Sequence, residues 1–334
     1  MSVAAPAIWP SLEDVIDPIR SIVAGADQIT CLAHKDADAD SLGSALGFAL
    51  ALRAMGRKVR VVVPEPLPRL LDYLPGFATV ETGGTPLGDT VFTFDCATLT
   101  RFGERRHEVE RAATVVNIDH HFGNTAFGSI NLVDASASAT GQVVDTLLKL
   151  LNAPITAAVA TNLYAALLTD TGGFRHENTN EAALRLGASL VAAGADPGWV
   201  ALKSYKSRSL SQVRLEGLSI AGMHSELDGC LLWSEVTELM LDQTGADMME
   251  AEGIIDALQS IATMEIAVLF KETARDTIKI SVRTRDPFDA TDVCTPFGGG
   301  GHRRAAGAEF VGETLPDARR MVLEVARRLI ESAR

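Results

Sequence analysis

The chain has 334 residues, of which 47% are hydrophobic, and its 30 Lys and Arg residues against 43 Asp and Glu give a formal net charge of -13. Single cores rarely grow much beyond about 250 residues, so this length favours two packed domains. The acidic balance argues against a broad surface for duplex DNA or long RNA, whereas a small anion held in one local site remains compatible with it.

The cysteine pattern and the hydropathy indicate a reducing compartment. The four cysteines form no CxxC pair and lie mostly in or beside apolar runs, which predicts buried free thiols. No run of about 18 apolar residues is present, and residues 1–10 lack the basic flank of a secretory signal. We therefore expect a cytoplasmic protein without membrane association. The cysteines are Cys31, Cys96, Cys230 and Cys294.

The first part of the chain alternates apolar runs with helical or loop stretches. This alternation predicts an α/β fold with a parallel sheet and helical crossovers. Strands are predicted at residues 29–33, 59–63, 91–94 and 114–118, a helix at 41–55, and helix-rich stretches at 139–151, 155–168, 181–193 and 199–220.

After about residue 222 the pattern changes to that of a smaller α/β domain. We predict strands at 231–236, 265–270 and 277–283, helices at 247–261 and 316–331, and a glycine run at 298–301. The expected organisation is a catalytic domain at 1–205, a connector at 206–222 and a second domain at 223–334, with the active-site cleft between the two domains.

Acids and imidazoles gather where predicted strands end. Since the carboxyl ends of parallel strands form the ligand crevice of such a sheet, we expect these side chains to converge although they lie far apart in the sequence. Taken singly, each is more often a cap, a turn residue or a surface residue. The set comprises His34, Asp38, Asp40, Asp95, Asp119, His120 and His121, with Asp170 at the end of a helical run.

So many carboxylates in one pocket would repel one another, and cations relieve that repulsion. Carboxylates mixed with imidazoles suit Mn(II), Co(II) or Zn(II) better than Ca(II) or Mg(II), which prefer oxygen ligands. Two ions about 3.5 to 4 Å apart, bridged by one aspartate, activate water and stabilise both oxygens of an in-line phosphoryl displacement. Phosphate ester hydrolysis is therefore the leading chemistry.

A second signal is the glycine run followed by His302, Arg303 and Arg304. Backbone amides of such a run can cradle a phosphate or carboxylate, although four glycines also suit a flexible connection. Arg101 and Arg175 follow Asp95 and Asp170 closely. Each suits either an anion clamp or a solvated surface position.

These motifs together resemble the DHH phosphoesterase superfamily. Residues 34–44 read HKDADADSLGS against the family's HxxPDxDxxGS, and residues 119–121 read DHH. Asp95 and Asp170 match further motifs, and residues 298–307 match the glycine-rich loop of the DHH-associated C-terminal domain. Ala37 stands where the family has proline, and Asp36 is an additional carboxylate beside the site.

Length and layout look most similar to the nanoRNase and pAp-phosphatase branch, which cleaves very short oligoribonucleotides and removes the 3′-phosphate of 3′-phosphoadenosine 5′-phosphate (pAp). The resemblance implies two Mn(II) ions, with Co(II) or Mg(II) as possible substitutes. It assigns His34 and Asp38 to one ion, Asp40, His120 and Asp170 to the other, and Asp95 to the bridge.

The resemblance also implies roles around the metals. Asp119 would orient the imidazoles, and His121 would contact the scissile phosphate or protonate the leaving oxygen. A homodimer is a family-level expectation. The terminal phosphate and nucleotide of the substrate would be held by Gly299, Gly300, Gly301, His302 and Arg283, with Arg101 as a further anion clamp.

Three alternative functions remain open from the sequence. Linear dinucleotides such as pApA or pGpG, derived from cyclic messengers, could be the substrates. The metal motifs are shared with family II pyrophosphatases, although their second domain differs. A nucleotide-binding regulator without turnover could keep the same metal site.

Overall fold

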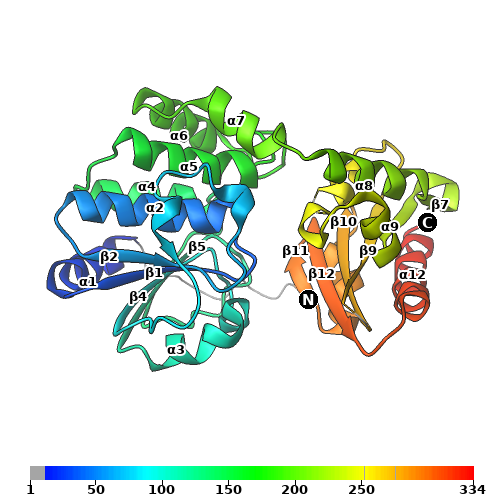
Figure 1. Ribbon diagram of the computed structural model, residues 1–334, viewed down its shortest axis with the longest axis horizontal. Coiled ribbons are helices and arrows are strands. Elements are labelled where there is room, and N and C mark those ends of the chain that lie inside the picture. Colours follow the sequence, from blue (N-terminus) through cyan, green and yellow to red (C-terminus); the bar gives the residue numbers. More distant parts are fainter. Residues whose placement is uncertain (1–11, 252, 275) are drawn as a thin grey trace. The chain divides into compact units, whose positions relative to one another are not determined.

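The computed structural model describes residues 12–251, 253–274 and 276–334, and the chain divides after Ser207 into two compact units (Figure 1). The stretch 1–10, for which we expect no secretory signal, lies outside the described residues. None of the described helices combines the length and the apolarity needed to cross a membrane. All four cysteines are free thiols, and three of them are buried, as predicted.

The first unit is built on a six-stranded sheet in which every neighbouring pair is parallel, as the sequence predicts. Its central strands are apolar and buried, which is the pattern of a sheet covered on both faces. Two edge strands, β3 and β6, were not predicted. In spatial order the strands are β3 (Val80–Glu81), β2 (Val59–Val62), β1 (Ile29–Ala33), β4 (Thr90–Phe94), β5 (Thr114–Asp119) and β6 (Ile130–Val133).

Helices cover one face of this sheet in layers (Figure 1). α2 (Ala39–Ala54) and α4 (Thr140–Leu150) contact the strands, and α5 (Ala157–Asp170) packs on both helices. α6 (Glu181–Ala192) and α7 (Pro197–Tyr205) pack against α5, and α1 (Leu12–Gly25) contacts α4 and β6. A 3-10 turn (Leu99–Arg105) and α3 (Arg106–Arg111) contribute Phe102 and Val109 to a separate core cluster with Leu32 and Val91.

Two glycines let α5 approach its neighbours closely. A Cβ atom at Gly43 would lie 2.7 Å from the carbonyl oxygen of Asn162, and one at Gly141 would lie 2.7 Å from Cβ of Ala166. Real Cβ atoms do not tolerate such distances, so α2 and α4 each need a glycine where α5 crosses them. This close packing brings the last residue of α5, Asp170, to the carboxyl edge of the sheet.

The second unit contains a mixed six-stranded sheet with helices on both faces. β8 and β9 are parallel, and the other neighbouring pairs are antiparallel. Two core clusters form, one with α11 (Ala290–Cys294) and α12 (Leu315–Ser332), the other with α8 (Leu210–Ala221), α9 (Glu238–Thr244) and α10 (Ile254–Gln259). The strands, in spatial order, are β11 (Gly300–His302), β12 (Ala305–Val311), β10 (Thr277–Thr284), β9 (Ile266–Ala274), β8 (Leu231–Val236) and β7 (His224–Glu226).

One helix-rich stretch contains two helices, and one predicted helix was wrong in its continuity. The stretch 199–220 forms two helices, because Ser209 caps a new helix by accepting a hydrogen bond from the Gln212 amide. The predicted helix 247–261 is a short 3-10 turn (Met248–Ala251) and α10, separated at Gly253, whose φ of 88° is incompatible with a helix. Most of the stretch assigned to a connector is α8, and Leu215 of α8 is fully buried in the second unit.

Candidate active site

A first group of possible metal ligands lies at the ends of β1 and β4. One ligand atom from each of His34, Asp38 and Asp95 lies within 4.8 Å of the others. His34 is buried, and its Nδ1 donates a hydrogen bond of 2.8 Å to the carbonyl oxygen of Lys35. The other ring nitrogen, Nε2, lies 3.9 Å from the carboxylate of Asp38 and 3.5 Å from that of Asp95.

The second group, Asp40, His120 and Asp170, comes from α2, the end of β5 and α5. Nδ1 of His120 lies 3.2 Å from the carbonyl oxygen of Ala137, and its Nε2 lies 3.8 Å from Asp40 and 3.7 Å from Asp170. Both imidazoles therefore present Nε2 to carboxylates. This is the donor set of a site for a transition-metal ion.

Asp95 lies between the two groups. Its Oδ2 is 3.5 Å from Nε2 of His34, and its Oδ1 is 3.5 Å from Nε2 of His120. The backbone of Asp95 has a left-handed φ of 60°, which is uncommon for a residue other than glycine. Thr140 holds the side chain by donating a 2.9 Å hydrogen bond to Oδ1. The two carboxylate oxygens of Asp95 thus face one histidine of each ligand group, an arrangement that suits a bridging ligand.

Helix starts position the two acids of α2. Asp38 is the N-cap of α2 and accepts a hydrogen bond of 2.9 Å from the Ser41 amide. Asp40 accepts hydrogen bonds of 2.7 and 2.9 Å from the amides of Thr140 and Gly141, in the first turn of α4. A carboxylate at a helix N-terminus is favoured by the helix dipole, so the orientation of Asp40 is determined by two helices at once.

The pKa values of three carboxyl groups in the site, those of Asp40, Asp95 and Asp170, are shifted from their usual range. Burial, together with the neighbouring carboxylates of Asp95 and Asp170, raises the pKa of Asp40 well above its usual range. Burial and Asp95 likewise raise the pKa of Asp170. Burial alone would also raise the pKa of Asp95, but the three surrounding imidazoles hold that pKa well below its usual range. A cation among these groups would relieve the repulsion between them.

The DHH tripeptide is anchored by its aspartate. Asp119 is fully buried, accepts a hydrogen bond of 2.7 Å from Nδ1 of His121, and accepts another of 2.5 Å from Nδ2 of Asn124. Burial opposes the charged imidazole, but Asp119 and Asp95 outweigh it and raise the pKa of His121 to about 9. The raised pKa favours the protonated form of His121, which together with Asp95 and His120 makes up a third group of possible metal ligands.

Arg101 also reaches this edge of the sheet. Its Nη2 lies 3.0 Å from Nε2 of His34, and its carbonyl oxygen accepts a hydrogen bond from the Lys35 amide. Ala37, which replaces the family's proline, is buried in the main core. The additional carboxylate Asp36 is exposed, and among the described residues it belongs to none of the possible ligand groups.

The sequence reasoning missed three supporting polar residues. Asn124 and Thr140 contact Asp119 and Asp95 as described above, and Asn178 donates hydrogen bonds to the carboxylate and the carbonyl oxygen of Asp170. Asn124 could have been noticed from its position three residues after His121. Thr140 and Asn178 have no local signal, because their roles depend on packing between distant elements.

In the second unit, strand register aligns Arg283 with His302. Arg283 of β10 pairs with Ala305 of β12, which in turn pairs with His302 of β11. Directly opposed residues share one face of a sheet, so both basic side chains belong to one row. Arg283 also lies 3.8 Å from the exposed carboxylate of Asp256.

The glycine run has a packing role that the sequence reasoning did not include. A Cβ atom at Gly299 would lie 2.3 Å from the carbonyl oxygen of Gly307, and one at Gly301 would lie 2.4 Å from that of Ala305. Both positions therefore need glycine to pair with β12. A Cβ atom at Gly300 would meet nothing within 4 Å. Of these three positions, Gly300 is therefore the one where close packing does not require glycine.

Comparison with known proteins agrees with this geometry. Residues 28–168 match the model of the DHH family, N-terminal domain, and residues 230–328 match the DHHA1 domain. The Thermus thermophilus bifunctional oligoribonuclease and PAP phosphatase NrnA is 31% identical over 324 residues, which cover 96% of this chain and 95% of the relative. The Bacillus subtilis protein of the same name is 26% identical over 290 residues, with coverages of 85% and 90%.

A solved structure shares the fold. An exopolyphosphatase-related protein from Bacteroides fragilis aligns with a TM-score of 0.86 at 24% identity, covering 95% of this chain and 96% of its own. At this identity the likeness describes the fold alone.

Proposed function

The chain belongs to the DHH superfamily of phosphoesterases, in the branch of the nanoRNases and pAp phosphatases, and we propose that it hydrolyses short oligoribonucleotides to mononucleotides and pAp to AMP and phosphate. The observation that carries this proposal is the position of Asp95 between His34 and His120, which joins two groups of ligands into one site. Relatives named for both activities support the choice of substrates.

The donor set fits two divalent cations. His34, Asp38 and Asp95 would hold one, and Asp40, His120 and Asp170, with the other oxygen of Asp95, would hold the second. Mixed imidazole and carboxylate ligands favour Mn(II), with Co(II) or Mg(II) as substitutes. Two bound cations would supply an activated water and stabilise charge on the phosphoryl oxygens.

Both reactions are the same displacement at phosphorus. A bond forms between water oxygen and phosphorus, the bond between phosphorus and O3′ breaks, and O3′ takes up a proton. A dinucleotide differs from pAp only in the second nucleoside, which is esterified to the phosphate that is attacked. One site can therefore perform both hydrolyses.

His121 is the best placed acid for the leaving O3′. It is partly exposed, and its protonated form is favoured by the buried Asp119, which also holds the orientation of the ring. A donor of this kind contributes about 10²- to 10⁴-fold to a proton transfer. Arg101, beside His34, is suited to neutralise a phosphoryl oxygen.

The second unit would hold the part of the substrate that both activities share. Arg283 and His302 lie in one row, and Gly299, Gly300 and Gly301 precede or form the strand that carries His302. A guanidinium and an imidazole in one row suit a terminal phosphate. The net charge of -13 disfavours long polyanions.

The deciding experiment supplies metal-stripped protein with Mn(II) and offers pAp, a 5′-phosphorylated diribonucleotide (pApA) and a long single-stranded RNA in parallel. We expect AMP from the first two and no mononucleotide from the third. The Asp95→Asn variant serves as the control for contaminating nucleases. Equal release from all three substrates would contradict the preference for short substrates, and no release from pAp and pApA would contradict the function.

A further inference from the structure

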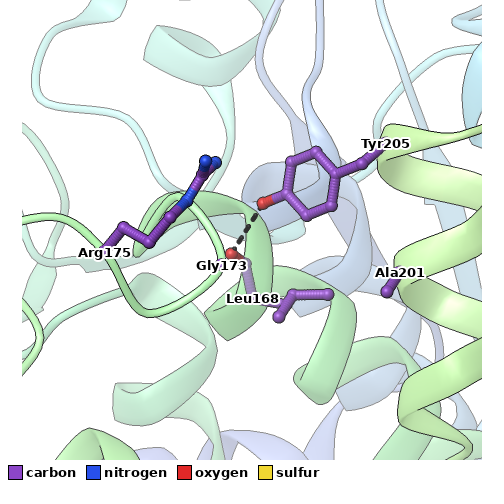
Figure 2. A pocket seen from close by; sticks show the side chains of 5 residues that line it. All are labelled: Leu168, Gly173, Arg175, Ala201 and Tyr205. Atoms are coloured by element: carbon purple, nitrogen blue, oxygen red, sulfur yellow. Dashed lines mark hydrogen bonds between the residues drawn. The ribbon is translucent and has the colours of Figure 1, made fainter. Parts of the chain in front are cut away.

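A cavity outside the two ligand groups lies next to Asp170. It has a volume of about 330 Å³ and is lined by Leu168, Gly173, Arg175, Ala201 and Tyr205. Figure 2 shows the guanidinium of Arg175 and the ring of Tyr205 on either side of Gly173. All five residues belong to the first unit, so the cavity does not depend on the second.

Backbone contacts hold the two long side chains in place. The hydroxyl of Tyr205 donates a hydrogen bond of 2.9 Å to the carbonyl oxygen of Leu168, and Nε of Arg175 donates one of 2.6 Å to that of Gly172 (Figure 2 shows the first). The Gly173 amide closes the same turn with a 2.7 Å bond to Leu168. Two of the residues that line the cavity, Leu168 and Gly173, thus belong to the same turn as Asp170. The carboxylate of Asp170 lies 3.7 Å from Nε2 of His120.

Gly173 keeps the space between the two side chains open. A Cβ atom there would lie 3.7 Å from Nε of Arg175 and 3.8 Å from the ring of Tyr205, so any side chain would begin to fill the cavity. Gly173 also has a positive φ of 73°, which favours glycine. Arg175 is exposed, and across the described residues no carboxylate lies within ion-pair distance of it. The cavity is therefore lined by the ring of Tyr205, by apolar side chains and by the guanidinium of Arg175, which has no carboxylate partner among the described residues.

We propose that this cavity binds a nucleobase, and that the base is that of the second nucleoside, which a dinucleotide has and pAp lacks. A planar base stacks on an aromatic ring, and a guanidinium both stacks on a base and donates to the acceptors on its edge. The inference rests on the proposed function. The turn that lines the cavity also carries Asp170, a proposed metal ligand, and the second nucleoside is esterified to the phosphate that is attacked, so its base would lie near this turn.

The test compares the ratio of the KM for pApA to the KM for pAp in Mn(II)-loaded full-length protein. Stacking is worth about 5- to 100-fold per base, so the Tyr205→Ala and Arg175→Ala variants should each raise this ratio by about tenfold. The Tyr205→Phe variant keeps the ring and should leave the ratio near that of the unchanged protein. An exposed arginine of α6, Arg185, provides the matched control as Arg185→Ala.

Two results would overturn the inference. One is an unchanged ratio in folded Tyr205→Ala and Arg175→Ala proteins. The other is an equal rise of both KM values, which would indicate displacement of Asp170. If the unchanged protein hydrolyses neither substrate, the proposed function fails. Calorimetric titration of EDTA-treated protein with pApA and pAp then decides the cavity separately, because selective loss of pApA binding in Tyr205→Ala supports it and any other result rejects it.

Discussion

The carboxylate of Asp119 lies 2.7 Å from Nδ1 of His121 and has no exposure to solvent. A buried anion in direct contact stabilises the charged imidazole, and the pKa of His121 is raised to about 9. The protonated form of His121 is thus favoured by a residue that is itself shielded from solvent.

The Asp119→Asn variant should lose this effect. An amide carries no charge, so the pKa of His121 should fall towards the ordinary histidine value of about 6.5. Because the acid must be protonated, activity is lost as pH rises through its pKa. We expect kcat for pAp at pH 8 to fall by up to about 30-fold, and the basic limb of the pH profile to move from near 9 to a lower pH.

The control for this experiment is Asp36→Asn, which removes an exposed aspartate outside the possible ligand groups. Its pH profile should match that of the unchanged protein. A basic limb that stays in place in folded Asp119→Asn would show that His121 is not the acid.

Removal of the bridging carboxylate should change the number of bound metal ions. Asp95 places one carboxylate oxygen 3.5 Å from His34 and the other 3.5 Å from His120, so in the proposed site the Asp95→Asn variant would leave both cations short of an anionic ligand. We expect two Mn(II) per chain in the unchanged protein and at most one in the variant, counted by plasma mass spectrometry after dialysis. Asp36→Asn is again the matched control, and equal metal content in Asp95→Asn would refute a bridging role.

Metal binding should release protons and strengthen as pH rises. The raised pKa values of Asp40 and Asp170 mean that the metal-free site holds protons at pH values where free aspartate has lost them. Calorimetric titration with Mn(II) in two buffers of different ionisation enthalpy measures the number released. An observed binding enthalpy independent of the buffer would contradict the prediction.

The same pKa shifts affect folding. A carboxyl whose pKa is higher in the folded than in the unfolded chain stabilises the fold below the unfolded pKa, and this contribution is lost as pH rises through the folded pKa. EDTA-treated protein should therefore lose the contribution of Asp40 and Asp170 to its thermal stability as pH rises above the unfolded aspartate value of about 3.9. Saturating Mn(II) should reduce that loss. A steeper loss with Mn(II) than with EDTA would contradict this account.

The close crossing of α2 and α5 predicts a costly Gly43→Ala substitution. The new methyl group would lie 2.7 Å from the carbonyl oxygen of Asn162, so the helices would have to separate. Overpacking of this kind costs about 1 to 3 kcal/mol in the free energy of unfolding, measured by urea denaturation. In the matched Gly25→Ala variant the methyl group meets nothing within 4 Å, and its effect should be smaller than about 0.5 kcal/mol.

Truncation of Arg283 should weaken binding of both substrates equally. If Arg283 holds the shared terminal phosphate, Arg283→Ala should raise the KM for pAp and for pApA by a similar factor, about tenfold, through loss of a charge-assisted hydrogen bond. Arg320, an exposed arginine of α12 paired with Asp317, gives the control Arg320→Ala. A fall in kcat without a change in KM would argue against a binding role for Arg283.

Much of the first unit follows from local sequence. The strands at 29–33, 91–94 and 114–118 lie within one residue of the observed bounds, because continuous apolar runs can only be buried in a covered parallel sheet. The placement of His34, Asp95 and His120 at one edge follows from the same rule, since parallel strands end on the same side. Family motifs then identify the remaining candidate ligands.

Only the tertiary structure decided how these side chains are held. Thr140 against Asp95 and Asn178 against Asp170 are contacts between residues whose own sequence neighbourhoods carry no signal for them. The cavity between Arg175 and Tyr205 likewise exists because α7 packs on α5. Strand and ligand patterns are local properties of a chain, whereas hydrogen bonds and cavities depend on distances between elements that only packing determines.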